Sequence, residues 1–187
     1  MARITLVRVA TADDGELVLQ ARQGSPDAAA ELFRRHWDGA WRLARTVTGR
    51  RDMADDIAQD AFERAFGALS RFDRTRPFAP WLHRIVVNRA LDLLRSERRL
   101  VGLDPADRLE GEWRDLRAED AALLHAVTGL NPQRRVVIVL RYGLGYAPPE
   151  IAALLDLPVG TVHSRLARAL DDLRDQQTEV EADVQGA

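Results

Sequence analysis

The chain has 187 residues and a mass of 20.9 kDa, a length that suits one ordinary domain or two small ones. Hydrophobic residues make up 46% and charged residues 30%, which is typical of a folded protein. The absence of cysteine excludes disulfides, thiolate metal sites and a cysteine nucleophile. No apolar run approaches the roughly 20 residues of a membrane-spanning helix, and the N-terminus lacks the pattern of a signal peptide. We therefore expect a cytoplasmic protein.

The charges are nearly balanced in total but segregated along the chain. All 27 basic residues are arginine, and 29 acidic residues bring the net charge to −2. A domain that grips duplex DNA unaided usually has a strongly basic face, so this balance argues against such a role. Residues 71–99 hold eight arginines and three acids, whereas residues 50–70 and 100–117 each hold five acids and three arginines. This segregation indicates several partner surfaces on one chain.

Helical patterns dominate, and the first four predicted helices form a domain over residues 12–99. They span, in chain order, residues 13–22, 25–49, 52–70 and 80–99. Ser25-Pro26 combines a capping residue with a proline at the first helical position. Asp52 is predicted to cap the third helix, with Asp55 and Asp56 in its first turn, where carboxylates suit the helix dipole. Residues 1–11 are predicted to be an N-terminal extension.

A second helical domain is predicted over residues 118–175, after an acidic, flexible linker at residues 100–117. Its predicted helices span residues 118–130, 131–142, 148–155 and 161–174. Asn131-Pro132 and Pro148-Pro149 mark two of the starts. The acidic tail, residues 176–187, is predicted to fray. The fold class is therefore all-α, with two small domains.

No residue set in the sequence suits catalysis or a bound cofactor. The four histidines stand singly, outside any metal-binding pair. Gly143-Leu144-Gly145 does not match a phosphate-binding loop. The acids near Asp55 are better explained as a solvated helix face than as a metal site. We expect no catalytic residue, no metal and no cofactor, so the protein is not predicted to be an enzyme.

The last two predicted helices have helix-turn-helix geometry, a short helix and a tight turn before a longer amphipathic helix. Ser164 and Arg168 lie opposite the apolar side of the last helix, with His163 and Arg165 flanking them. Small polar and arginine side chains suit entry into a DNA major groove. An ordinary helical hairpin is the alternative.

The fourth predicted helix carries a polar stripe suited to a nucleic-acid backbone. Its members follow each other at steps of three or four residues: Arg84, Asn88, Asp92, Arg95 and Arg99. In the arginine-containing loop before this helix, Phe72 could stack on an unpaired base. It could equally be a core residue at the end of a helix.

Four stretches of the chain together resemble the RNA polymerase sigma-70 family, in its extracytoplasmic-function (ECF, group 4) subfamily. The stretches are Asp55–Phe62, Pro80–Asp92, Arg134–Tyr142 and Glu150–Leu166. The resemblance covers residues 12–175 and implies a four-helix sigma region 2 followed by a region 4 helix-turn-helix. It implies a promoter-specificity subunit that binds core polymerase, recognises −35 and −10 elements, assists melting and initiates transcription.

The resemblance also implies which residues contact each partner. Core polymerase is expected to contact Asp55, Asp56, Gln59 and Asp60. The −10 element is expected to contact Phe72, Arg76, Trp81, Arg84, Asn88 and Arg95. The −35 element is expected to contact His163, Ser164, Arg165 and Arg168. The expected partners are the clamp helices and flap of core RNA polymerase, promoter DNA and an anti-sigma factor, with a monomer when free and no membrane insertion.

Three departures from the family pattern affect the −35 domain. Ala147-Pro148-Pro149-Glu150 replaces a helix start that often begins with serine. His163 stands where many members have a basic residue, and Asp171 and Asp172 interrupt a usually basic stretch.

Two alternative functions stay open: an autonomous helix-turn-helix regulator that dimerises on palindromic sites, and a polymerase-binding regulator that never directs initiation.

Overall fold

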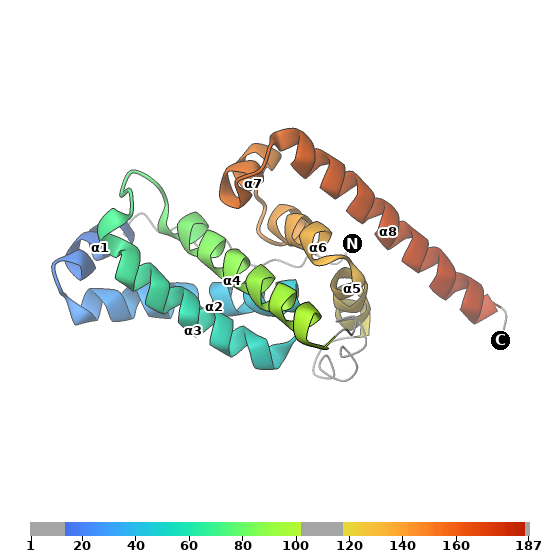
Figure 1. Ribbon diagram of the computed structural model, residues 1–187, viewed down its shortest axis with the longest axis horizontal. Helices are drawn as coiled ribbons and strands as arrows, with labels where there is room; N and C mark the ends of the chain where they lie inside the picture. Colours follow the sequence, from blue (N-terminus) through green and yellow to red (C-terminus); the bar gives the residue numbers. More distant parts are fainter. Residues whose placement is uncertain (1–13, 102–117, 186–187) are drawn as a thin grey trace. The chain divides into compact units, whose positions relative to one another are not determined.

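The computed structural model describes residues 14–101 and 118–185, and their side chains within 14–97 and 122–176. Over these ranges every regular element is helical (Figure 1), and the all-α class is confirmed. The chain divides into an N-terminal unit that ends at Ser96 and a C-terminal unit that begins at Glu97. The predicted extension at residues 1–11 and most of the predicted linker lie outside the described residues.

The N-terminal unit consists of four helices and one short turn of 3-10 helix. They are α1 (Asp14–Arg22), α2 (Pro26–Thr48), α3 (Arg51–Ala68), η1 (Leu69–Arg71) and α4 (Phe78–Val101), whose last five residues lie beyond the boundary at Ser96. As predicted, Ser25 caps α2, and its hydroxyl accepts a hydrogen bond from Ala28 N at 3.3 Å. The helix ends at Gly49, whose φ of 76° lies in the left-handed region that glycine adopts without strain.

The prediction that Asp52 caps α3 is wrong. Arg50 occupies the cap position and makes no side-chain capping bond, and the helix already begins at Arg51. Asp52 is the second helical residue and accepts a hydrogen bond from Arg50 Nε at 3.0 Å. Because α3 begins at Arg51, Asp55 and Asp56 lie in its second turn and not in its first.

Helix α4 begins two residues earlier than predicted. Phe78 is its first residue and is only 1% exposed, because it packs against Phe72 and Trp81. Pro80 then falls within the first turn, where its missing N–H breaks no helical hydrogen bond. The proline that marks the helix in the sequence is therefore inside it.

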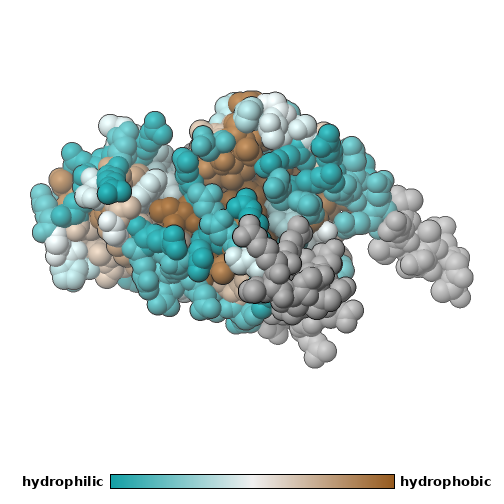
Figure 2. All heavy atoms as spheres, in the orientation of Figure 1, coloured by the Kyte–Doolittle hydropathy of each residue, from teal (hydrophilic) through white to brown (hydrophobic). Residues whose placement is uncertain are grey.

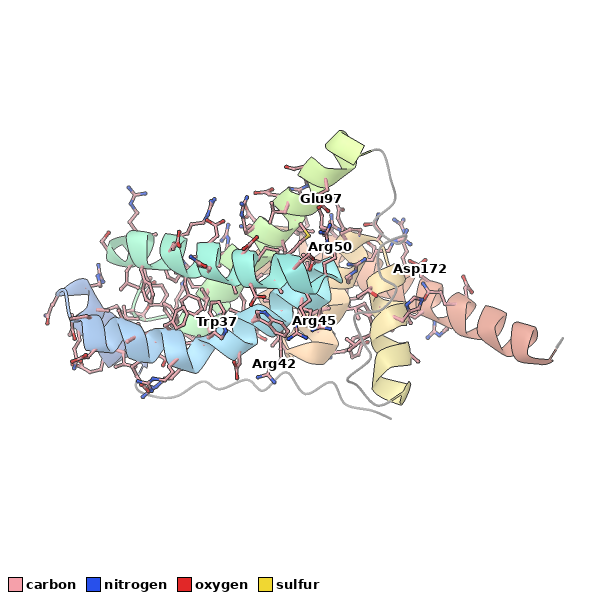
Figure 3. All side chains as sticks on the ribbon, turned by 90° about the horizontal axis from the view of Figure 1, so that it is seen from below. Trp37, Arg42, Arg45, Arg50, Glu97 and Asp172 are labelled. Carbon is pink, nitrogen blue, oxygen red and sulfur yellow. The ribbon has the colours of Figure 1, made fainter. Side chains whose placement is uncertain are left out.

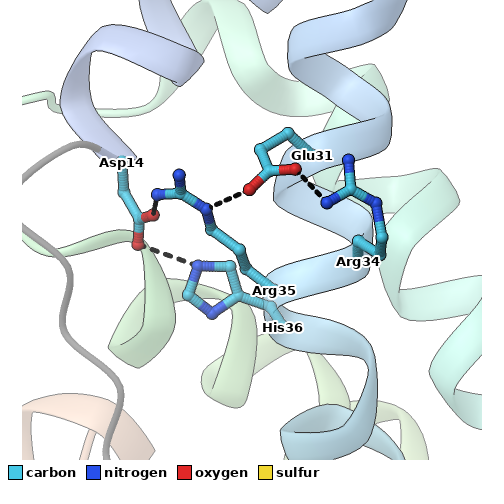
Figure 4. A network of polar contacts seen from close by, with 5 residues as sticks. All are labelled: Asp14, Glu31, Arg34, Arg35 and His36. Atoms are coloured by element: carbon cyan, nitrogen blue, oxygen red, sulfur yellow. Dashed lines mark hydrogen bonds and ion pairs between the residues drawn. The ribbon is translucent and has the colours of Figure 1, made fainter.

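A network of charged side chains fastens the start of α1 to α2 (Figure 4). Asp14 is buried, and its carboxylate accepts hydrogen bonds from His36 Nε2 at 2.8 Å and from Arg35 at 3.4 Å. Glu31 completes the network with Arg35 at 2.6 Å and with Arg34. Because removing one partner would leave another charge partly buried, the network favours a fixed position of α1 on α2.

The C-terminal unit contains α5 (Ala118–Gly129), α6 (Pro132–Ile138), a π-type turn η3 (Val139–Gly143), α7 (Pro148–Leu155) and α8 (Val159–Gln185). Asn131 caps α6 as predicted and accepts a hydrogen bond from Gln133 N at 3.0 Å. The helix was expected to reach Tyr142, but the π-type turn replaces its last residues. At the start of α7, Ala147 cannot cap, and Glu150 instead accepts from Ala147 N at 2.7 Å.

Helix α8 is longer than predicted at both ends. It begins at Val159 instead of Thr161 and continues to Gln185 instead of stopping at Arg174. The sequence between Arg174 and Gln185 contains neither glycine nor proline, so no helix-breaking residue interrupts it. The residues up to Gln185, where a frayed tail was expected after Gln176, are therefore part of α8.

Candidate functional surfaces

Helix α3 presents an acidic face to solvent. Asp55, Asp56 and Gln59 are exposed, as the amphipathic pattern requires. The opposite side of the helix is buried and consists of Ala54, Ile57, Ala58, Ala61 and Ala65. Three of the four residues expected to contact polymerase thus share one exposed face, whereas the fourth, Asp60, is half-buried.

Trp41 of α2 adjoins this acidic face, and no pattern in the sequence marks it as functional. Its indole Nε1 donates a hydrogen bond to Asp55 Oδ1 at 2.9 Å. The guanidinium carbons of Arg45 and Arg51 lie 5.4 and 6.0 Å from its ring centroid, within reach of a cation–π interaction. Figure 3 shows Arg45 and Arg50 near the end of α2. Trp41 therefore holds the Asp55 carboxylate in one orientation.

Asp60 lies between two arginines from different helices. Its Oδ2 atom is 2.5 Å from Arg89 Nε of α4, and its Oδ1 atom accepts a hydrogen bond from Arg64 Nε at 3.0 Å. The side chains of Asp60 and Arg89 are 28% and 33% exposed. The acidic face of α3 is therefore linked to α4 through a half-buried ion pair.

The loop before α4 is anchored by an aromatic cluster. Phe72 is only 5% exposed, and its ring centroid lies 4.8 Å from that of Trp81 and 5.8 Å from that of Phe78. This burial favours the core-residue alternative that the sequence left open. Phe72 nevertheless lines an open pocket, together with Gly15, Glu16, Arg22, Asp73, Arg74 and Thr75. Arg76 is exposed, with its Nε atom 3.5 Å from Asp73.

The polar stripe on α4 is exposed along its described length. Arg84, Asn88 and Arg95 all face solvent, and Arg95 donates to Asp92 at 2.9 Å. The side chain of Arg99 lies outside the described residues. In Figure 2, hydrophilic residues cover much of the face that α4 occupies in Figure 1. The stripe on α4 and the loop before it thus both expose polar side chains, and the loop has an aromatic base.

The first half of α8 exposes three of the four residues expected at the −35 element. His163, Ser164 and Arg168 face solvent, whereas Arg165 is half-buried and donates to Gln133 Oε1 at 2.8 Å. Burial lowers the pKa of the Arg165 guanidinium below its usual value. Gln133 of α6 therefore joins this surface, although its sequence position did not suggest so.

The second half of α8 carries acids that are paired within the unit. Asp172 forms an ion pair with Arg134 of α6, at 2.8 Å from Oδ1 and 2.5 Å from Oδ2. Asp171 pairs with Arg174 at 2.8 Å. One of the two acids that depart from the family pattern thus links α8 to α6.

Neither a membrane span nor a metal site is found within the described ranges. None of the helices there is long and apolar enough to cross a bilayer. No group of three or more histidine or acidic side chains in those ranges has the arrangement of a metal site.

Comparison with known proteins identifies both units. Residues 32–100 match the family description Sigma-70 region 2, and residues 120–173 match Sigma-70, region 4. The chain belongs to the sigma-70 family. Its curated relatives place it in the ECF subfamily, and it is a promoter-specificity subunit of bacterial RNA polymerase. Members of this family regulate transcription.

Individual relatives match this sigma factor over most of their length. It is 31% identical over 175 residues to the ECF RNA polymerase sigma factor SigW of Bacillus subtilis, covering 85% of this chain and 94% of the relative. A solved structure of CnrH in complex with the cytosolic domain of CnrY has a TM-score of 0.67 and 32% identity, covering 89% of this chain and 97% of that one. The sigma factor RpoE from Bartonella quintana, solved with the anti-sigma factor NepR, has a TM-score of 0.64, covering 80% of this chain and 96% of that one; at 21% identity it shows the fold alone.

Proposed function

We propose that this sigma factor divides its work among three surfaces. The acidic face of α3 docks onto core polymerase, the loop at residues 71–77 and α4 capture the melted −10 element, and the first half of α8 reads the −35 element. The observation that carries the proposal is the exposed stripe of Arg84, Asn88 and Arg95 on α4, preceded by a loop whose residues line a pocket.

The docking surface consists of Asp55, Asp56 and Gln59, with Asp60 at its edge. Carboxylates on a rigid helix suit a basic partner surface, and their pre-organisation lowers the entropy lost on binding. The hydrogen bond from Trp41 supports this role, because it fixes the orientation of Asp55 before the partner arrives. The expected partner is the clamp helices of polymerase, while the C-terminal unit contacts the flap.

The −10 surface combines groups that suit an unpaired strand. The Asn88 amide can pair with a base edge, while Arg84 and Arg95 can neutralise phosphates. A flipped base would enter the pocket beside Phe72, whose ring is held by Trp81. Unstacking costs a few kcal/mol per step, which such contacts offset. Arg76 extends the basic surface along the loop.

The −35 surface presents His163, Ser164 and Arg168 at the N-terminal half of a helix-turn-helix reader. Arg165 is held by Gln133, so its guanidinium approaches DNA from a fixed position. Because only one arginine of this set, Arg168, is exposed, we infer that polymerase supplies much of the affinity for promoter DNA.

We also infer a non-catalytic, cytoplasmic subunit, because RNA synthesis belongs to core polymerase and this chain works on its surface. An anti-sigma factor is the expected regulator. That expectation is supported by the sigma factors of similar fold that were solved in complex with protein partners.

The test is reconstitution with bacterial core polymerase. The full chain should bind core tightly and produce start-specific run-off transcripts from a genomic promoter pool. Asn88→Ala should lower open-complex formation on the strongest promoter and spare core binding, whereas Gln23→Ala, an exposed change in the turn after α1, should alter neither. Failure to bind core at low salt would overturn the proposal, and an equal loss of core affinity would remove the assigned role of Asn88.

A further inference from the structure

Asp60 differs from its neighbours on the acidic face of α3 because it points toward α4. Its Oδ2 atom and the Arg89 Nε atom are both shielded from solvent and lie 2.5 Å apart. A second arginine, Arg64, donates to the other oxygen. The carboxylate is therefore already engaged with two cations of its own chain, unlike the exposed Asp56.

Arg89 directly follows Asn88 on α4, and the two side chains point in different directions. Successive residues on a helix are rotated by about 100°, so Asn88 faces solvent while Arg89 turns inward toward α3. Any rotation of α4 that moved Asn88 would pull Arg89 away from Asp60. Separating a half-buried ion pair leaves two charges with incomplete solvation, which opposes that rotation.

We propose that Asp60 is a positioning residue for −10 capture: through Arg89 it holds α4 in the rotation that exposes Asn88 and Arg84. This, and not direct contact with polymerase, is its main contribution. The inference rests on the proposed function, in which α3 docks and α4 reads DNA. It also explains why a carboxylate in the docking stretch is half-buried while Asp55 and Asp56 are exposed.

The experiment compares Asp60→Asn, Arg89→Gln and the double variant in the full chain, reconstituted with core polymerase. Two quantities are measured: affinity for core, and open-complex formation at saturating polymerase on the strongest promoter that the wild-type protein selects from a genomic pool. Glu63→Gln is the matched control, because Glu63 is an exposed acid on the same helix. Arg89→Lys retains the charge and should restore most of the lost function.

We expect each single variant to lower open-complex formation about tenfold. The double variant should form open complexes no more poorly than the more impaired single variant, as coupled partners require. Core affinity should stay within about twofold, a margin that corresponds to only ~0.4 kcal/mol. Val47→Ala, a buried change in α2, provides a variant of lowered stability. It should not reproduce this separation of DNA capture from core binding.

Three results would overturn the inference. If Asp60→Asn weakens core binding about tenfold and Arg89→Gln does not, Asp60 is a polymerase contact. If Val47→Ala shows the same separation, or if both charge variants lose core and DNA binding in proportion to stability, the pair is merely structural. Wild-type protein that directs no transcription would instead refute the proposed function, and the inference with it.

Discussion

Acidification is expected to destabilise the N-terminal unit through one buried histidine, His83 of α4. Its imidazole is only 7% exposed. Burial, reinforced by repulsion from His36, lowers the pKa of His83 from 6.5 to about 4. At pH values between these two pKa values, the histidine binds a proton in the unfolded chain but not in the folded protein. The free energy of unfolding therefore rises with pH in this range. The contribution is complete above about pH 6.5 and is lost as the pH falls to about 4.

The size of the effect follows from the two pKa values. A difference between about 4 and 6.5 corresponds to about 3 kcal/mol in total, of which about 2 kcal/mol is lost by pH 5. Small domains have a free energy of unfolding of roughly 5–15 kcal/mol. A loss of this size is therefore a large fraction of the stability of the unit.

The assay is urea unfolding at pH 7.5 and pH 5, followed by tryptophan fluorescence, because three of the four tryptophans, Trp37, Trp41 and Trp81, lie in the N-terminal unit. In His83→Met, the decrease between the two pH values should be smaller by about 2 kcal/mol than in the wild type. His125→Gln, an exposed change in the other unit, should leave the decrease intact. An unchanged pH dependence in His83→Met would refute the reasoning.

Three further changes test single contacts. Arg135→Met removes a buried guanidinium that donates to two backbone carbonyls around the end of α5, so the C-terminal unit should lose about 2 kcal/mol in denaturant unfolding followed by circular dichroism. Trp41→Phe removes the donor to Asp55 but keeps the ring, and should lower core affinity about three- to tenfold in a binding titration. His163→Arg adds a permanent charge and should tighten promoter binding by the holoenzyme, with a salt dependence steeper by about one ion.

Matched variants separate these effects from general damage. Arg174→Met, at an exposed side chain, should leave stability unchanged. Trp37→Phe, one turn before Trp41, should leave core affinity unchanged. An equal loss of core affinity in this variant would mean that the effect of Trp41→Phe does not come from the hydrogen bond to Asp55. His163→Gln should not steepen the salt dependence; equal slopes in the arginine and glutamine variants would argue against a phosphate contact.

The parts of the fold that depend on local chemistry could be predicted from the sequence. Ser25 and Asn131 cap their helices as expected, because a side-chain oxygen followed by proline satisfies the first turn without help from other elements. Asp52 does not cap α3, although its residue type is equally suitable. Gly49 ends α2 and only Arg50 separates the two helices, so the packing of the pair determines where α3 starts.

The candidate surfaces, too, could be predicted from the sequence only where they depend on one helix. Helical periodicity alone was enough to predict that Asn88 and Arg84 share an exposed stripe. The contacts of Trp41 with Asp55 and of Asp60 with Arg89 join different helices, and no spacing rule connects such residues. The burial of Phe72 likewise depends on Phe78, which the expected helix start excluded from α4.

The acids in the second half of α8 illustrate how packing changes the meaning of a sequence departure. Compared with the family pattern, Asp171 and Asp172 suggest repulsion of the DNA backbone. Asp172, however, is paired with Arg134, and Asp171 with Arg174, so each carboxylate is already next to a cation of its own unit. A paired charge contributes a weaker field at a distance than an isolated one, and salt screens it further. The affinity of α8 for DNA therefore depends mainly on its first half, where Arg168 remains exposed and His163 occupies the position of a frequent basic residue.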